Sequence, residues 1–162
     1  MDIIKKLDKI FLNLKIHNFI IIIILLGISN FLFNLLPNLL FKNVYVNNFN
    51  SPTSIILNSI FLQIYTISIG PFLETFIFQF LIIKICKNLF KNYTVGFILS
   101  IILFSLFHNY SLEYIFSVLP AAIFFAYIFI LYDKYKMNPL IRLTFIHSVF
   151  NLIPLLVIKF II

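Results

Sequence analysis

The amino-acid sequence predicts an all-α fold, a polytopic bundle of five or six transmembrane helices. Of the 162 residues, 62% are hydrophobic and only 10% are charged, whereas soluble domains carry about 25% charged residues. The mean hydropathy is +1.11, and the apolar residues form runs long enough to cross a bilayer. A chain of this length has room for one domain and for no separate soluble module.

The net charge of +7 indicates membrane topology rather than a nucleic-acid partner. The basic residues lie in short clusters at the ends of apolar runs, the pattern by which cytoplasmic loops set the orientation of a membrane protein. We therefore expect the lipid bilayer, and no nucleic acid, as a partner. We also expect an integral protein of the cell (plasma) membrane with its N-terminus in the cytoplasm.

Residues 1–17 predict a basic amphipathic lead-in on the cytoplasmic face. Lysines alternate there with isoleucine, leucine and phenylalanine, which is typical of a helix at a membrane surface. Residues 18–36 are apolar and long enough to span, and no small-residue cleavage site follows, so we expect an uncleaved first transmembrane helix. Residues 37–54 are polar and almost uncharged, and they predict a loop on the opposite side. Residues 18–162 then form a single transmembrane domain.

Residues 55–87 are too long for a simple crossing, because 33 helical residues would reach about 50 Å against about 30 Å of hydrocarbon. Gly70-Pro71 is expected to divide them into two halves. Pro71 has no N–H to donate and suits the first turn of a new helix. Glu74 would then lie in that first turn, where the helix dipole favours negative charge.

The remaining apolar segments, 93–109, 111–132 and 139–162, predict further helices. If residues 55–87 cross once, every basic cluster lies on the side of the N-terminus, as the positive-inside rule favours. The chain then crosses five times, with residues 55–69 shallow, re-entrant or steeply tilted. If Gly70-Pro71 forms a tight hairpin, there are six spans and the second basic cluster lies outside.

Glycine is scarce, with 3 residues against 22 phenylalanines. Close helix crossings in membranes rely on small residues. We therefore expect bulky Phe and Ile side chains, rather than close crossings, to fill the space between the helices.

Glu74 is the only charged residue between Lys42 and Lys84. A carboxylate within the membrane is costly, and an ionisable residue there is a functional-site hypothesis by default. Counted from the nearest basic cluster at 1.5 Å per residue, Glu74, His108 and His147 lie about 20, 25 and 16 Å into the membrane. The three side chains are therefore expected to be able to meet.

Two pairs of residues four apart add to this set. Phe104 shares a helix face with His108, and His147 shares one with Asn151. Together with Glu74 they form a hydrolytic set. The carboxylate can take a proton from water, the imidazoles can orient that water or bind a metal, and His and Asn donors can stabilise an oxyanion.

This ordered set resembles the CPBP family of intramembrane proteases, also called the CAAX-processing and bacteriocin-processing or Abi family. The resemblance covers residues 55–158. The family pattern is EExxxR, then FxxxH on the next helix, then HxxxN or HxxxD on a late helix. The matching positions are Glu74, Thr75 and Gln79, then Phe104 and His108, then His147 and Asn151.

The resemblance implies a CPBP-like core and a role for each matching residue. Glu74 would be the base that activates water, and His108 would hold that water. His147 and Asn151 would bind the carbonyl oxygen as it becomes an oxyanion. Two mechanisms are described for the family: one uses a divalent metal such as zinc, here held by Glu74, His108 and His147, and the other uses no metal.

The sequence departs from the pattern at two supporting positions, where Thr75 replaces the second Glu and Gln79 replaces the Arg. These two residues are four apart, so a hydrogen bond between them could replace the lost ion pair.

The resemblance implies an intramembrane endopeptidase that hydrolyses a peptide bond in a membrane-associated peptide or lipidated protein, as in CAAX-type or bacteriocin-type processing. A catalytically inactive immunity or interaction protein on the same fold is an alternative, because the family pattern is broken at Thr75 and Gln79. A small transporter with Glu74 as a proton or cation site is a further alternative, although the chain shows no inverted repeat.

Overall fold

The structure is a computed structural model that describes residues 2–14, 19–28 and 59–161. Every regular element within these ranges is a helix, as predicted. The predicted loop 37–54 and much of the first predicted span lie outside the described residues. The described helices are α1 (Asp2–Asn13), the helix Phe19–Ile28, the long helix Ile60–Phe90, α7 (Thr94–Phe107), α8 (Leu112–Lys134) and α9 (Pro139–Ile161).

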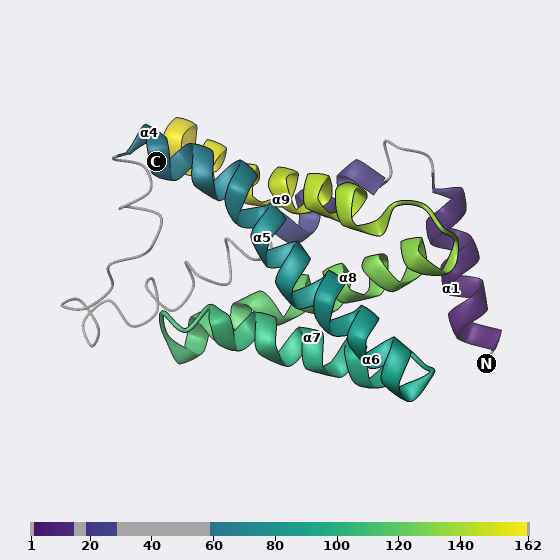
Figure 1. Ribbon diagram of the computed structural model, residues 1–162. Coiled ribbons are helices and arrows are strands. Elements are labelled where there is room, and N and C mark those ends of the chain that lie inside the picture. The colour runs from purple at the N-terminus through teal and green to yellow at the C-terminus, as the bar shows by residue number, and fades with distance from the viewer. Residues whose placement is uncertain (1, 15–18, 29–58, 162) are drawn as a thin grey trace.

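Residues Ile60–Phe90 form one uninterrupted helix, built from α4 (Ile60–Ile64), η1 (Tyr65–Ile69), α5 (Gly70–Glu74), η2 (Thr75–Leu81) and α6 (Ile82–Phe90). The elements η1 and η2 are π-helical turns, which are wider than an α-helical turn. Figure 1 shows this helix running through the molecule, with α7 and α8 on one side and α9 packed along its first half.

The predicted break at Gly70-Pro71 is therefore wrong, and so is the tight hairpin. Gly70 has φ −55° and ψ −58°, which is ordinary helical geometry. The missing N–H of Pro71 is accommodated by the preceding π turn instead of by a helix end. A broken helix would leave several backbone groups unpaired in hydrocarbon, which costs far more than one widened turn. Glu74 consequently lies inside a continuous helix and not at a helix N-terminus.

Three of the described helices are long and apolar enough to cross a membrane, namely Ile60–Phe90, Tyr114–Lys134 and Pro139–Val157. Phe19–Ile28 and Thr94–Phe107 are shorter apolar helices. These helices identify an integral membrane protein, as predicted from composition.

The basic clusters gather at one end of the bundle. Asp133 at the end of α8 accepts hydrogen bonds from Lys84, from Lys87 at 3.0 Å and from the Tyr93 hydroxyl at 2.7 Å. This contact joins the second basic cluster, in the second half of the long helix, to the third, at the end of α8. In Figure 1 the α6–α7 and α8–α9 connections lie at the same end of the molecule as α1.

Helix α1 is attached to α8 at that end. Asp8 is buried and accepts hydrogen bonds from Tyr127 at 3.0 Å and from Lys134 at 3.2 Å. Phe11 packs against the rings of Tyr127 and Phe124. The polar and aromatic contacts together place the basic lead-in across the end of the bundle.

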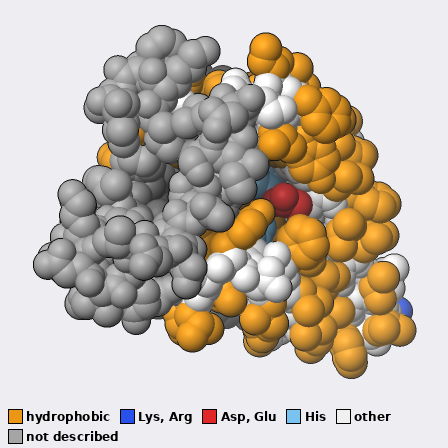
Figure 2. Space-filling view, turned by 90° about the vertical axis from the view of Figure 1, so that its left-hand side faces the viewer, with side chains coloured by type: hydrophobic (Ala, Val, Ile, Leu, Met, Phe, Trp, Pro, Cys, Tyr) orange, Lys and Arg blue, Asp and Glu red, His pale blue; other side chains and the backbone are white. Residues whose placement is uncertain are grey.

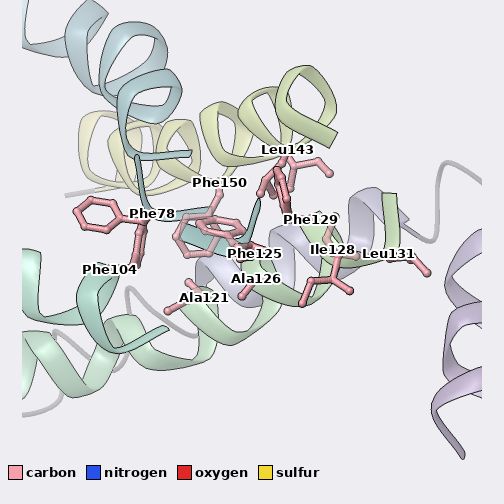
Figure 3. Packing of buried hydrophobic residues seen from close by; sticks show 14 of the residues in the cluster. Phe78, Phe104, Ala121, Phe125, Ala126, Ile128, Phe129, Leu131, Leu143 and Phe150 are labelled. Carbon is pink, nitrogen blue, oxygen red and sulfur yellow. The ribbon is translucent and has the colours of Figure 1, made fainter. Parts of the chain in front are cut away.

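The core lies between α8 and its neighbours, as Figure 3 shows. Phe125 of α8 stands edge-on to Phe104 of α7 and to Phe150 of α9. Bulky side chains fill most of the space between helices, as predicted.

Gly96 is an exception to that prediction. A Cβ atom at position 96 would lie 2.9 Å from the Cα of Ile83. The α6 and α7 backbones thus approach as closely as a glycine permits, and the expectation of no close crossing is wrong at this pair of helices. A single glycine is enough for two helices to approach closely when it lies against the backbone of the other helix.

Candidate active site

The structure brings Glu74, His108 and His147 together from three separate segments. The Nε2 atom of His147 lies 3.4 Å from the Oε2 atom of Glu74, and the Nε2 atom of His108 lies 3.7 Å from the same oxygen. The Glu74 and His108 side chains keep 20% and 16% of their surface exposed, whereas His147 keeps 2%. Two imidazole nitrogens are therefore directed at one carboxylate oxygen of a partly accessible group.

Figure 2 shows this arrangement from one end of the molecule. Carboxylate and imidazole atoms are visible at this face, and the described side chains beside them are mostly hydrophobic. Glu74 Oε2 is buried and accepts no hydrogen bond from the described residues. An unpaired acceptor of this kind can accept a hydrogen bond from a water molecule.

His108 is positioned by the end of α7. The helix ends at Phe107, and His108 leaves helical geometry with φ −87° and ψ 48°. Its Nδ1 atom lies 2.8 Å from the carbonyl oxygen of Phe104. A carbonyl only accepts, so Nδ1 carries the proton of the neutral ring, and Nε2 presents a lone pair towards Glu74. The predicted Phe104–His108 pair is thus a helix C-cap in which the backbone of Phe104 takes part.

His147 is held by Thr75. Its Nδ1 atom lies 3.4 Å from the Thr75 hydroxyl oxygen, and both residues are buried. Thr75 directly follows Glu74 in the chain, so one short segment supplies both the carboxylate and the hydroxyl that contacts His147. The supporting position that departs from the family pattern therefore lies within the site.

Gln79 is fully buried one turn further along the same helix, and neither polar atom of its side chain has a hydrogen-bond partner among the described residues. The hydrogen bond expected between Thr75 and Gln79 is not formed, because the Thr75 hydroxyl faces His147 on α9.

Asn151 lies one turn after His147 on α9. Its Nδ2 atom donates a hydrogen bond of 3.0 Å to the backbone carbonyl of Thr66 in η1. The amide predicted to act in the site is thus engaged with the helix that carries Glu74.

Aromatic rings surround the two imidazoles. Phe125 lies 4.5 Å from the His147 ring between centroids, and Phe104 lies 4.6 Å from the His108 ring. Tyr114 is stacked on His108 at 6.2 Å. Sequence reasoning identified Phe104 but missed Phe125 and Tyr114, because an aromatic residue in an apolar helix has no local signal that distinguishes a site wall from general core.

The described residues contain no group of three or more His, Cys, Asp and Glu side chains arranged to hold a metal ion. The binding of a divalent metal by Glu74, His108 and His147 therefore stays a prediction from the family resemblance.

The family described as type II CAAX prenyl endopeptidase Rce1-like matches residues 55–153, which is more than half of the chain. The chain belongs to this Rce1-like family. The match includes Glu74, His108, His147 and Asn151, and it confirms the resemblance to CPBP-type membrane proteases. No curated protein and no solved structure matches the chain.

The Rce1-like family is a family of proteases, and its name describes hydrolysis of CAAX prenyl proteins. Membership therefore agrees with a helical membrane protein whose partners are the bilayer and a membrane-associated substrate.

Proposed function

We propose that the protein is an active intramembrane endopeptidase in which Glu74 activates the attacking water. The observation that carries this proposal is the convergence of two Nε2 atoms, 3.4 and 3.7 Å away, on one Glu74 oxygen. These distances exceed an ordinary hydrogen bond, and catalytic hydrogen bonds in free enzymes are often long.

A water between Glu74 and His108 would meet two acceptors. Glu74 Oε2 and the lone pair on His108 Nε2 each accept one of its hydrogens, and the oxygen lone pairs of the water remain directed away from both. The oxygen attacks the peptide carbonyl carbon while Glu74 takes the proton. Positioning of this kind and general-base assistance together contribute several powers of ten to a hydrolysis rate.

His147 is the proposed oxyanion donor. If the Thr75 hydroxyl donates to Nδ1, the ring proton resides on Nε2, where it stabilises the negative oxygen of the tetrahedral intermediate. The intermediate then collapses as the C–N bond breaks, and Glu74 returns its proton to the leaving amine. The products are a free carboxylate and a free amine.

The proposed substrate is a lipidated protein or peptide with a CAAX-type C-terminus, from which a C-terminal tripeptide is removed. Family membership supports this class, and the hydrophobic side chains beside the site in Figure 2 suit a lipid-bearing chain. We further propose that the basic end faces the cytoplasm, following the positive-inside rule, and that the protein resides in the plasma membrane.

The test uses the full chain reconstituted in lipid vesicles with a farnesylated peptide that carries a quenched fluorophore beyond the lipidated cysteine. We expect the wild type to release the C-terminal tripeptide and Glu74→Gln to release none. Cleavage of an unlipidated leader peptide, with the farnesylated peptide untouched, would shift the substrate to bacteriocin-type processing. Cleavage of neither would refute the proposed activity.

An inactive immunity or interaction protein is a second candidate, favoured by Gln79. In the family an Arg occupies this position, whereas here an uncharged side chain is buried with no partner among the described residues. An experiment in the host distinguishes the active protease from the inactive protein. A host phenotype that survives Glu74→Ala, His108→Ala and His147→Ala does not depend on catalysis.

A further inference from the structure

A backbone carbonyl two turns before Glu74 has no donor within its own helix. In an α-helix the carbonyl of Thr66 would accept from the N–H of Gly70, and in a π turn it would accept from residue 71. The N–H of Gly70 is donated to Tyr65. Residue 71 is proline and has no N–H. Neither backbone donor therefore reaches the carbonyl of Thr66.

Asn151 supplies the missing donor from another helix. Its Nδ2 atom lies 3.0 Å from the carbonyl oxygen of Thr66, 85 residues away in the chain. An unpaired carbonyl in the apolar interior of a membrane protein is costly. The bond therefore connects α9 to η1 at a carbonyl for which Pro71 supplies no backbone donor.

This connection lies beside the proposed catalytic contact. Asn151 is one turn from His147 on α9, and Thr66 is two turns from Glu74 on the long helix. The Nε2 atom of His147 and the Oε2 atom of Glu74 are 3.4 Å apart. A bond between the two helices at this level fixes their separation and axial register close to that contact.

We infer that Asn151 is a positioning residue, whose side-chain amide pairs with the Thr66 carbonyl that Pro71 leaves free and so holds Glu74 opposite His147. The inference rests on the proposed function, and it assigns Asn151 a role different from the oxyanion contact that the family resemblance implies. Pro71 and Asn151 act together: the proline lacks the N–H that would bind the Thr66 carbonyl, and the asparagine amide donates to that carbonyl instead.

The test is a double-mutant cycle between Pro71→Ala and Asn151→Leu in the full chain. Alanine restores an N–H at position 71, and leucine keeps the branched shape of asparagine without a donor. Unfolding in detergent is followed with a thiol-reactive dye, since Cys86 is a buried free cysteine that becomes reactive on unfolding. Asn151→Leu should lower Tm by about 5 °C, and at least half of this loss should disappear in the Pro71→Ala background.

The same cycle is read in peptidase kinetics on the farnesylated peptide. A positioning role predicts that Asn151→Leu lowers kcat by between about 10- and 100-fold with KM unchanged, and that Pro71→Ala restores part of this loss. If Asn151 instead donated to the oxyanion, Asn151→Leu would lower kcat by the same factor in the wild-type and Pro71→Ala backgrounds. That result would overturn the inference.

Ser148→Ala is the matched control, because the Ser148 hydroxyl bonds within α9 to the carbonyl of Thr144. Its effect should add to that of Pro71→Ala with no coupling. If Pro71→Ala does not fold, Asn151→Gln, which keeps an amide donor, should have a higher Tm than Asn151→Leu, and equal values would refute the pairing. Coupled Tm values in a protein without peptidase activity would refute the proposed function and leave the positioning bond standing.

Discussion

At the scale of single residues, Thr75 is the side chain that connects the proposed base to the proposed oxyanion donor. It follows Glu74 in the chain, and its hydroxyl lies 3.4 Å from His147 Nδ1. A hydroxyl that donates to Nδ1 keeps the ring proton on Nε2, facing the reaction. The residue that departs from the second Glu of the family pattern therefore supplies a partner for the imidazole of His147.

Replacing Thr75 tests this connection. Thr75→Val is nearly isosteric but has no hydroxyl, so the His147 ring loses the partner that selects its tautomer and orientation. We expect kcat to fall by on the order of 10- to 100-fold with KM little changed. Thr75→Ser retains the hydroxyl and should keep most of the activity. Equal activity of the valine and serine variants would exclude a role for the hydroxyl.

Gln79 is a buried amide without a hydrogen-bond partner among the described residues. Burying an unpaired polar group costs about 1–3 kcal/mol. Gln79→Met keeps the length of the side chain and removes that cost, so the free energy of unfolding should rise by roughly 1 kcal/mol. Unfolding followed at Cys86 measures the change. A lower Tm for Gln79→Met would instead mean that the Gln79 amide makes a stabilising hydrogen bond in the folded protein.

The meeting of the ionisable residues Glu74, His108 and His147 could be predicted from the sequence, whereas the groups that contact them could not. Glu74 and His108 are rare residue types in an apolar chain, so each is conspicuous, and helix rise placed them at similar depth. The role of Thr66 could not be predicted, because it contributes a backbone carbonyl that every residue possesses. The family pattern identifies Thr75, but spacing predicts Gln79 as its partner, because spacing shows only contacts within one helix.

At the scale of helices, the long helix Ile60–Phe90 shows how proline can be kept within a membrane helix. Spacing rules predicted a break at Gly70-Pro71, because they describe one helix in isolation. The structure accommodates Pro71 with a π turn and with a donor from α9. Such compensation depends on a distant segment, and for this reason it could not be predicted from local sequence.

The α6–α7 pair depends on Gly96. A Cβ atom there would meet the Cα of Ile83 at 2.9 Å and the Cβ of Cys86 at 3.1 Å. Gly96→Ala must push the two backbones apart, which should lower the free energy of unfolding by about 1–3 kcal/mol. Thermal unfolding of the purified variant, followed by circular dichroism because the dye site adjoins the mutation, measures the loss.

Gly27→Ala is the comparison for Gly96→Ala. The nearest atom to a Cβ at position 27 is the Cδ1 end of the Ile153 side chain, and a flexible side chain can move. The loss of stability should therefore be smaller than at Gly96. An equal or larger loss at Gly27 would contradict the view that the α6 backbone limits the α6–α7 distance.

At the scale of the whole molecule, the polar contacts at one end determine how the helices are connected in space. Asp133 joins the end of α6 to the end of α8, and Asp8 joins α1 to α8. These contacts place every basic cluster at the same end, as a single crossing by residues 55–87 requires. Charge patterning thus predicted that the basic clusters lie at one end of the bundle, whereas it did not predict the continuous helix.

Topology can be measured with an impermeant thiol reagent on vesicles of known orientation. Single cysteines are introduced at Lys5, Lys91 and Lys136 in a Cys86→Ser background. All three should be labelled from the same side, and a cysteine at Tyr110, in the α7–α8 connection, should be labelled only from the other side. Labelling of Lys91→Cys from the side of Tyr110→Cys would contradict the single crossing.

The central claim is that Glu74 and His108 hold one water and act as a unit. The most direct measurement is kcat/KM on the farnesylated peptide for Glu74→Gln, His108→Ala and the double variant, each verified as folded by the Cys86 assay. Each single change should lower kcat/KM by on the order of 10³-fold, and the double variant should be no worse than the more damaged single variant. Losses that multiply in the double variant, or activity that survives Glu74→Gln, would contradict the account.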